Sequence, residues 1–484
     1  MRSSRGNPVW KDFLYCKTMK WTLTLALLLI DLLTFAQKVE FVSADGRSMS
    51  MEDILQEYIQ IPSDSGSEKK AGDYLKSVCA ASGLYIADFG SQDGNFNFAA
   101  SLFPLDSRKP NIIFLNHIDV VPESRDSDTP YSGLIKDGSI YGRGAIDNKG
   151  AAVQQLYGML LAAKKEDIGR SPYNITFLAV SCEETQCAGG ISYVIENFFE
   201  DLNPVVVFGE GPTEITSLID GEFRQPIFGI SVAHKRAFWL ELKLEFAANG
   251  HGSVTPLEYA NKQMVASLHN LTRKKQKAVF TDVNTGFLKE MAEHRKGLEK
   301  FLLKHPRLFK PLLVPQLRKQ PELFSIFSNT ITLTDIHTNS EAFNKIASTA
   351  TAHLDCRLLP ETDEQEFLRK VKKRLKNDNI QISIVEALNR NVPSSTDNIY
   401  YHNLRDAILE KYPTATTMNL LMPNINDLGA FRTKGIPAYG NFPIYLDKEE
   451  AESIHGKNEH ISIQELYNGA DVYYILMKKM IYSK

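Results

Sequence analysis

Short strand-like runs that end in acidic or histidine side chains constrain the fold of this chain more than any other feature. The segments at 112–115, 141–146, 175–180 and 205–208 lead into His117 and Asp119, Asp147, Glu183 and Glu184, and Glu210. Apolar runs of this length are typical of buried parallel strands. In open α/β sheets, functional groups gather beyond the carboxyl ends of such strands. The sequence therefore predicts an α/β protein with a functional site at these strand ends.

The first half of the chain alternates strand-like runs with amphipathic helices, from Met51 to Phe208. This alternation is the pattern of βαβ units in a mostly parallel sheet. One helix is expected to begin near Asn148, directly after Asp147, because the apolar residues that follow share one helical face.

The pattern changes near Gly221. Segments 228–232 and 239–244 alternate in the manner of half-buried antiparallel strands, and a helical stretch rich in Lys, Leu and Phe covers 287–323. Helix and strand alternate again from Asn398. We predict a discontinuous catalytic domain, with a mostly parallel sheet flanked by helices, and an inserted α+β lid domain. The expected borders are 46–224 and 389–484 for the catalytic domain and 225–388 for the lid.

Residues 1–36 are expected to form a secretory signal peptide. Basic residues precede an apolar segment, Trp21 to Ala36, whose end offers small residues to a signal peptidase. The segment contains Asp31 and is short for a membrane span, which needs ~20 apolar residues. Met19 is an alternative start, and an uncleaved membrane anchor is the less favoured interpretation. We expect a secreted or periplasmic protein with no stable membrane insertion after processing.

Charge and cysteine content limit the classes of partner. A net charge of -3 gives no reason to expect nucleic acid or an anionic membrane as a partner. Cys182 and Cys187 flank the glutamate pair, and they either form a disulfide in an oxidising compartment or remain buried free thiols. The cysteine spacing is unlike that of a zinc-cysteine site.

The imidazoles and carboxylates together form a donor set for two metal ions. Two divalent ions ~3.5–4 Å apart can share a water molecule and stabilise both oxygens of a reacting carbonyl. Zinc accepts such nitrogen and oxygen donors. His117 and His455 would supply the imidazoles, and Asp147 would bridge the ions. Glu184 and an acid near Glu210 would be the terminal ligands.

Asp119 and Glu183 are candidates for supporting roles. In an extended segment His117 and Asp119 point the same way, so Asp119 can accept the second ring N–H of His117 and fix its tautomer. Glu183, beside the ligand Glu184, can act as a general base. Taken singly, these motifs are more often surface pairs, helix caps or solvated acids at a helix start. Only their joint placement at four strand ends favours a metal site.

Longer stretches around these residues resemble the di-zinc metallopeptidase family that includes carboxypeptidase S, aminoacylase and succinyl-diaminopimelate desuccinylase. The similar stretches are 116–122, 142–150, 183–185, 250–253, 357–360 and 455–459. They run in family order over nearly the whole chain after Met51. The helical stretch and the C-terminal part are most similar to the carboxypeptidase S branch.

The resemblance implies two Zn²⁺ ions, with Co²⁺ or Mn²⁺ as alternatives. It places His117 and Glu210, or a neighbour of Glu210, on one ion, Glu184 and His455 on the other, and Asp147 between them. Asp119 would orient His117, and Glu183 would be the general base.

The resemblance also assigns roles to the lid. His251 would support the oxyanion, in many relatives across a dimer interface. Asn344 and Arg357 would hold the substrate carboxylate, because a guanidinium can meet a carboxylate with two hydrogen bonds. A homodimer through the lid is the corresponding family expectation, unless the helical stretch blocks it.

The chain departs from the family pattern at two informative places. Gly209-Glu210-Gly211 stands where the branch often has Asp-Glu-Gly, so a ligand is missing unless Glu210 itself coordinates. Asn426-Asp427-Leu428-Gly429 stands where related enzymes have Thr-Asp-Ser-Arg, so an arginine is lost. The second change puts the substrate preference in doubt.

We predict a secreted zinc-dependent hydrolase that cleaves an amide bond next to a free carboxylate by attack of a metal-bridging hydroxide. The substrates would be small peptides, dipeptides or N-acyl amino acids, as for carboxypeptidases, dipeptidases and aminoacylases. The alternative is a non-catalytic ligand-binding homologue of the same fold with an incomplete metal site, which the change at Gly209 supports. A metal-dependent phosphoesterase is a third interpretation.

Overall fold

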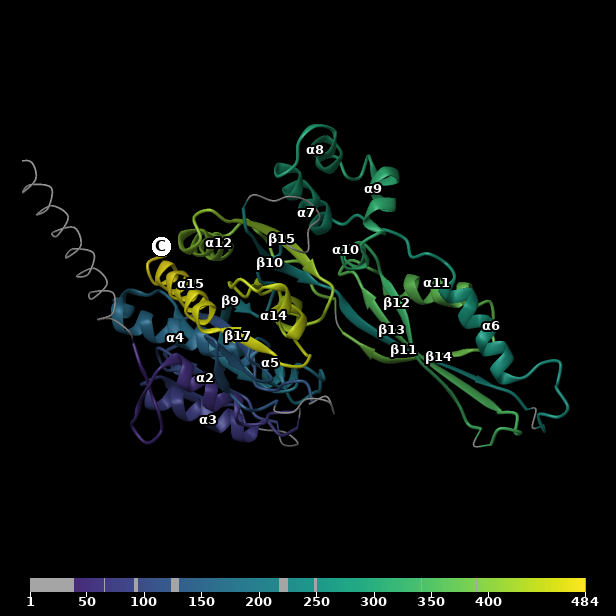
Figure 1. Ribbon diagram of the computed structural model, residues 1–484, viewed down its shortest axis with the longest axis horizontal. Coiled ribbons are helices and arrows are strands. Elements are labelled where there is room, and N and C mark those ends of the chain that lie inside the picture. The colour runs from purple at the N-terminus through teal and green to yellow at the C-terminus, as the bar shows by residue number, and fades with distance from the viewer. Residues whose placement is uncertain are drawn as a thin grey trace, which may run out of the picture.

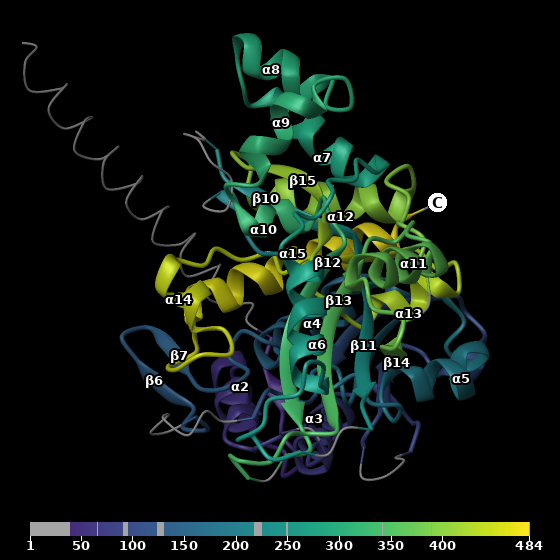
Figure 2. The ribbon, with the colours of Figure 1, turned by 90° about the vertical axis from the view of Figure 1, so that its right-hand side faces the viewer.

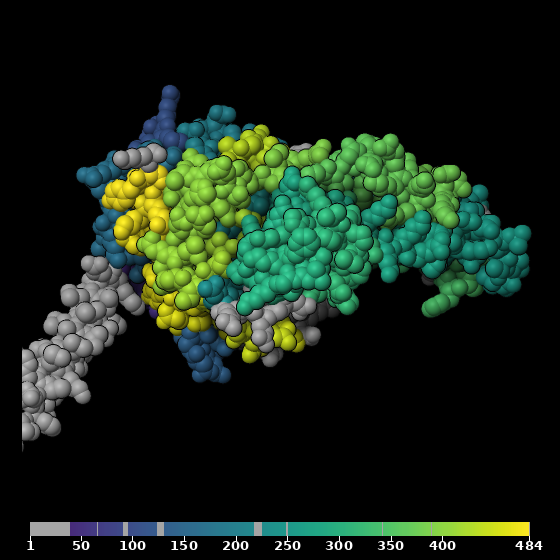
Figure 3. Space-filling model, turned by 90° about the horizontal axis from the view of Figure 1, so that it is seen from above, coloured from purple at the N-terminus to yellow at the C-terminus, as the bar shows by residue number. Residues whose placement is uncertain are grey.

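A computed structural model describes residues 39–64, 66–90, 95–122, 130–216, 225–247, 250–340, 342–388 and 390–483. The predicted signal peptide at 1–36 lies outside these residues. Among the helices of the described part, none is long and apolar enough to cross a membrane. An eight-stranded sheet with flanking helices forms the larger body, and a four-stranded sheet extends from it to one side (Figure 1). The space-filling view from above shows the teal and green middle part of the chain projecting from the larger body (Figure 3).

The larger sheet is mixed and mostly parallel, with strand order β15-β10-β16-β9-β5-β8-β4-β3. At its centre β5 (Asn111–His117) runs parallel to both β8 (Asn174–Val180) and β9 (Pro204–Gly209). β5 and β8 are buried along their whole length, which explains their continuous apolar sequences. The other strands are β3 (Tyr85–Asp88), β4 (Phe98–Ser101), β10 (Ile227–His234), β15 (Thr416–Met422) and β16 (Ala438–Gly440).

Helices cover both faces of this sheet. Ile112 and Phe114 of β5 pack on one face, in a core shared with α2 (Met51–Ile59), α3 (Lys69–Ala81), α4 (Lys149–Lys165), α12 (Ile399–Lys411) and α15 (Ile463–Ile481). Ile113 and Leu115 pack on the other face, against α5 (Ile191–Leu202) and α13 (Leu428–Thr433). The expected helix after Asp147 is confirmed, since Asn148 is the N-cap of α4.

Both ends of the chain build the larger sheet. β15 and β16 come from the C-terminal part and lie beside β10 and β9. The predicted α/β class, with a sheet built from separate parts of the chain and an inserted second unit, is confirmed.

The smaller sheet has the order β12-β13-β11-β14, and all its neighbouring strands are antiparallel. Its strands are β11 (Arg236–Glu245), β12 (Thr330–Thr338), β13 (Thr349–Leu358) and β14 (Gln381–Ala387). One face packs against α6 (Ala260–Thr272) and α11 (Glu364–Leu375). The predicted helical stretch forms α7 (Asp282–Glu293), α8 (Gly297–Lys304), α9 (Lys310–Leu317) and α10 (Pro321–Ser325), of which α7 to α9 lie at the top of Figure 2.

One expectation for the lid is wrong. Segment 228–232 belongs to β10, which is buried throughout and lies in the larger sheet, parallel to β15 and antiparallel to β16. The apparent alternation arises from Gly229 and Ser231, which are small residues in buried positions. A Cβ on Gly229 would lie 2.7 Å from Pro212, so the size of this residue reflects close packing and not exposure. The chain enters the smaller sheet only at β11, and the exact domain borders remain predictions.

A three-stranded sheet joins two segments that carry candidate ligands. β7 (Ser139–Tyr141) pairs with β17 (His460–Ser462) and with β6 (Leu134–Lys136). This pairing brings the stretch before Asp147 beside the turn that holds His455. The remaining elements are β1 (Phe41–Val42), β2 (Ser48–Met49), α14 (Lys448–Ser453) and the 3₁₀ turns at Leu105–Ser107 and Ile168–Arg170.

Candidate functional site

The structure brings together the five residues that we predict as metal ligands. They arrive from the end of β5, the start of α4, the loop after β8, the end of β9 and the turn after α14, and they are His117, Asp147, Glu184, Glu210 and His455. Two groups of three side chains have ligand atoms within 4.8 Å of one another: His117 with Asp147 and Glu184, and His117 with Glu183 and Glu210.

Asp147 lies between the two histidines. Its Oδ1 is 3.1 Å from Nε2 of His117, and its Oδ2 is 3.1 Å from Nε2 of His455. On the two outer sides, Glu210 Oε2 is 3.9 Å from His117 Nε2, and Glu184 Oε1 is 3.5 Å from His455 Nε2. This is the arrangement expected of a carboxylate that can bridge two ions, each with one imidazole and one terminal acid.

The donor set fits divalent cations. Among the described residues, Oε1 of Glu184 is buried with no hydrogen bond of normal geometry and has only the 3.5 Å contact with His455, so it is available to a metal ion. Burial, together with the charge of Asp147, raises the pKa of Glu210 to about 8. Burial raises the pKa of Asp427 to about 7, and burial and Glu210 raise that of Glu183. Cations held between these acids would relieve both the desolvation and the repulsion.

The surrounding acids favour the protonated form of both histidines. Hydrogen bonding to Asp147 raises the pKa of His455 to about 10. Burial lowers the pKa of His117, but Asp119 and Asp147 outweigh it and hold this pKa well above its usual value. Ligand histidines must be neutral, so metal binding would release these protons.

Asp119 supports the site in a different way from the one expected. The closest acceptor for His117 Nδ1 is the backbone oxygen of Asp119, at 2.9 Å, and the carboxylate Oδ1 is 3.6 Å away. The carboxylate instead accepts hydrogen bonds from the backbone N–H groups of Glu183, at 3.1 Å, and Glu184, at 3.0 Å. Asp119 therefore fixes the tautomer of His117 mainly through its backbone, while its side chain holds the glutamate pair.

A disulfide closes the loop that carries the glutamate pair. Cys182 and Cys187 are bonded to each other, which decides between the two alternatives left open by the sequence. Glu183 and Glu184 lie between them, in turns that precede α5 rather than at a helix start. The loop is thus held in two ways, by the disulfide that joins its ends and by the hydrogen bonds from its backbone to Asp119.

Sequence reasoning missed a buried ion pair beneath the site. Arg143 Nη1 lies 3.0 Å from Glu459 Oε2, and Glu459 Oε1 accepts hydrogen bonds from the backbone N–H groups of Ile146, at 2.9 Å, and Asp147, at 3.1 Å. Arg143 Nη2 also donates to the backbone oxygen of His455 at 3.3 Å. Both residues fall within stretches that resemble the family, but no local pattern pairs positions so far apart.

Asn426 and Asp427 were also missed as site residues, although their loop stood out as a departure from the family. They line a narrow cleft together with His117, Glu183 and Glu210. Asn426 Nδ2 donates to the backbone oxygen of Glu210 at 3.2 Å. The loop therefore forms a wall of the site and helps to position Glu210.

Two of the predicted lid residues lie at the far end of the smaller sheet, and the third lies at its near end, where Arg357 pairs with Ala237 at the start of β11. His251 and Asn344 contact each other, with His251 Nε2 and Asn344 Nδ2 3.0 Å apart, in the connections that follow β11 and β12. Figure 1 shows this end of the smaller sheet at the lower right, away from the labelled strand β9 of the larger sheet. Arg357 is paired with Asp355 through two contacts of 2.8 and 3.1 Å. The roles of these three residues remain predictions.

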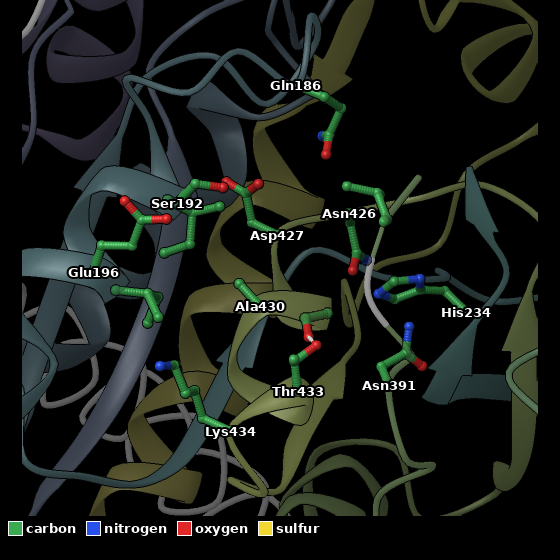
Figure 4. Close-up of a pocket in the computed structure, with 14 residues that line it drawn as sticks. Gln186, Ser192, Glu196, His234, Asn391, Asn426, Asp427, Ala430, Thr433 and Lys434 are labelled. Atoms are coloured by element: carbon green, nitrogen blue, oxygen red, sulfur yellow. Dashed lines mark hydrogen bonds between the residues drawn. The ribbon is translucent and has the colours of Figure 1, made fainter. Parts of the chain in front are cut away.

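A second hollow opens beside the cluster. It is a cavity of about 380 Å³ between α5, α13 and the end of β10, and Asn426 and Asp427 line it as well as the narrow cleft (Figure 4). Its position next to the candidate ligands makes it a candidate place for part of a substrate.

Comparison with known proteins agrees with this geometry. The sequence matches Peptidase family M20/M25/M40 over residues 113–479. It is 26% identical over 436 residues to the human N-fatty-acyl-amino acid synthase/hydrolase PM20D1, covering 86% of this chain and 85% of the relative. It is 23% identical over 395 residues to the probable carboxypeptidase S-like 2 of Dictyostelium discoideum, covering 79% and 74%.

A solved structure shares the fold. The M20 family metallo-carboxypeptidase Sso-CP2 from Sulfolobus solfataricus superposes with a TM-score of 0.65 at 20% identity, over 88% of this chain and 98% of that one. These matches confirm the resemblance of the sequence motifs to the metallopeptidase family that includes carboxypeptidase S. The chain belongs to the M20/M25/M40 peptidases, a family of metallopeptidases and amidohydrolases.

Proposed function

We propose that this protein is a secreted di-zinc hydrolase that cleaves an amide bond next to a free carboxylate. Small peptides, dipeptides and N-acyl amino acids are the substrate classes, and Co²⁺ or Mn²⁺ could replace zinc. The observation that carries this proposal is the placement of Asp147, whose two oxygens each face a different histidine at 3.1 Å.

When bound, two ions would activate a water molecule and polarise the scissile carbonyl. Glu183 is buried at the edge of the cluster, and burial raises the pKa of its carboxyl group. A raised pKa brings a carboxylate closer to the range in which it exchanges protons at neutral pH. Glu183 would accept a proton from the attacking water and deliver it to the nitrogen of the leaving amine.

The metal ligands of this proposal do not need an aspartate at position 209. A Cβ on Gly209 would lie 3.1 Å from both Leu115 and Leu428, so a longer side chain has little room there. Glu210 approaches His117 instead. This contact supports Glu210 as the terminal acid and weakens the argument for an incomplete site.

The named relatives support the choice of bond. The amide bond of an N-acyl amino acid lies next to a free carboxylate. The last peptide bond of a carboxypeptidase substrate lies next to a free carboxylate in the same way. The Cys182–Cys187 disulfide supports secretion, since disulfides persist in oxidising compartments. His251, Asn344 and Arg357 would reach the substrate after closure of the lid or from the lid of a second subunit.

The test is metal content per chain together with turnover of a panel of dipeptides and N-acyl amino acids. We expect two ions per chain in both the wild type and Glu183→Gln, with turnover reduced by roughly 10²–10⁴-fold in the variant. Glu200→Gln, on the exposed side of α5, is the matched control and should behave as the wild type.

A ligand-binding homologue is the second candidate, supported by the glycine at position 209. One ion or none per chain, with no turnover of either substrate class, would make that candidate the better one. Turnover of phosphate esters instead of amides would favour the phosphoesterase interpretation.

A further inference from the structure

We propose that the cavity beside the metal ligands is a substrate subsite selective for a neutral group that donates hydrogen bonds, and that His234 is the residue that selects it. The group would be a carboxamide or a hydroxyl on the substrate. This inference rests on the proposed hydrolase function and adds a substrate preference to it.

The cavity is placed to receive a part of the substrate next to the reacting bond. Asn426 and Asp427 line both the cavity and the narrow cleft that contains His117 and Glu183. Apolar side chains, among them Ile191, form part of the wall. A substrate held at the metal ligands could therefore extend into the cavity.

His234 is a buried acceptor at this cavity. The residue is 1% exposed, and its Nδ1 lies 2.7 Å from the backbone oxygen of Lys235. A carbonyl oxygen only accepts hydrogen bonds, so Nδ1 must carry the proton. Burial and the charge of Arg432 lower the pKa of His234 to about 3, so the ring is neutral. Nε2 is therefore a lone-pair acceptor, and it is buried without a hydrogen-bond partner among the described residues.

Asn426 supplies a second acceptor close by. Its Nδ2 donates to the backbone oxygen of Glu210 at 3.2 Å, which fixes the orientation of the amide. Its Oδ1 is buried and, like His234 Nε2, has no partner within the part of the chain that the structure describes. Figure 4 shows the ring of His234 pointing toward Asn426 at one side of the cavity. Two unsatisfied acceptors thus belong to residues that line the same cavity.

Charged side chains of both signs surround the cavity, because Asp427 lines it as well as Lys434. The charge that acts most on His234 is that of Arg432. The guanidinium of Arg432 is buried and donates to backbone oxygens of Ser231 and Ala438, with no ion pair to a described carboxylate. At the exposed rim, Glu196 and Lys434 carry opposite charges. A carboxamide or hydroxyl would satisfy the acceptors without bringing a second positive charge near Arg432.

Gly429 leaves the space that the ring of His234 occupies. A Cβ at this residue would lie 2.5 Å from Nε2 and 2.6 Å from Cε1 of His234, so any larger residue would displace the ring. Gly429 is also the position at which the loop differs from the arginine of related enzymes. The two residues therefore form one unit, and changing either should alter the same preference.

A site built to pair with a donor discriminates strongly against an analogue that lacks it, because the acceptors then stay unpaired. The test compares kcat/KM for pairs of dipeptides that differ in one side chain of nearly the same shape. The pairs are Gln against Met and Thr against Val, placed in turn at the first and at the second residue of the dipeptide. We expect the wild type to prefer the donor-bearing member at one position by roughly 10–100-fold. His234→Leu should bring this ratio close to one.

Gly429→Ala is the second variant, and its kcat/KM ratio of donor-bearing to apolar substrate should also fall. The test therefore still decides if one of the two variants fails to fold. Melting temperature and metal content are measured for each variant. His305→Leu, in the exposed connection between α8 and α9, is the matched control and should keep the wild-type ratio.

The outcomes separate the two proposals. Hydrolysis without a preference in the wild type, or with a preference that survives in both variants, overturns the subsite and leaves the proposed function standing. Absence of turnover for every substrate overturns the proposed function and this inference with it.

Discussion

Arg143 and Glu459 form a buried ion pair that holds two ligand-bearing segments together. Their Nη1 and Oε2 atoms are 3.0 Å apart, and the two side chains are 3% and 1% exposed. Glu459 also accepts hydrogen bonds from the backbone of Asp147, while Arg143 donates to the backbone of His455. The pair therefore sets the distance between the bridging carboxylate and one of its histidines, although neither residue is a ligand.

Glu459→Gln should destabilise the protein and weaken metal binding. Removing one member of a buried pair leaves the other charge uncompensated, at a cost of about 3–5 kcal/mol. Loss of support behind metal ligands typically lowers affinity by about 10–100-fold. Urea unfolding and a zinc titration would measure both effects. Asp73→Asn, at the exposed Lys69–Asp73 pair, is the control, and an equally small effect of Glu459→Gln would contradict the positioning role.

Single ligand variants should remove the ions in a defined pattern. Asp147→Asn is expected to lose both ions, because each oxygen of Asp147 faces a different histidine. Glu210→Gln should lose only the ion beside His117 and retain the other. Elemental analysis would count the ions per chain.

Metal removal should also lower the stability of the wild type. Metal at 100 times its dissociation constant stabilises the folded state by about 3 kcal/mol, and a chelator should abolish this gain. The gain should be absent in Asp147→Asn. Two retained ions in Glu210→Gln, or an undiminished thermal shift in Asp147→Asn, would show that the ligands lie elsewhere.

Reduction of the Cys182–Cys187 bond should loosen the glutamate pair. The two cysteines are five positions apart, and closing a loop this short stabilises a fold by about 2 kcal/mol through chain entropy. Cys187→Ser should lose this contribution and bind zinc more weakly, as seen by unfolding and by titration. Reductant should reproduce the loss in the wild type and add nothing to the variant. A reductant effect of equal size in the variant would point to another cause.

His234 should make stability fall with pH below neutrality. Its pKa is about 3 in the folded protein against an ordinary value of 6.5, so between these values the unfolded chain binds a proton that the folded chain does not. The contribution is complete above pH 6.5 and is lost as the pH falls toward 3. From pH 7 to pH 5 the wild type should lose about 2 kcal/mol more than His234→Leu. Parallel pH dependence of unfolding in the two metal-free proteins would contradict this.

The α/β class and the candidate ligands followed from local pattern. Continuous apolar runs mark strands that are buried on both faces, and parallel strands end at a common edge, so acids and histidines just beyond those runs were expected to meet. The structure places His117, Glu184 and Glu210 at that edge, and the helix expected after Asp147 begins there. No long-range information was needed for these inferences.

Other features depended on contacts that local pattern does not contain. Segment 228–232 has the alternation of a half-buried strand, yet β10 is covered on both faces, because its side chains pack into two hydrophobic cores that include distant segments of the chain. The pairing of Arg143 with Glu459 spans 316 positions, and the role of the Asp119 side chain depends on where the β8 loop passes. The sequence by itself determined the fold class and four of the candidate ligands, because these follow from periodicity and strand-end placement, whereas His455 lies in a turn after α14 and was suggested by the family resemblance. The tertiary structure alone decided the disulfide, the buried ion pair and the cavity at His234. The disulfide depends on how the loop between the two cysteines turns, and the ion pair and the cavity form only when segments far apart in the sequence pack together.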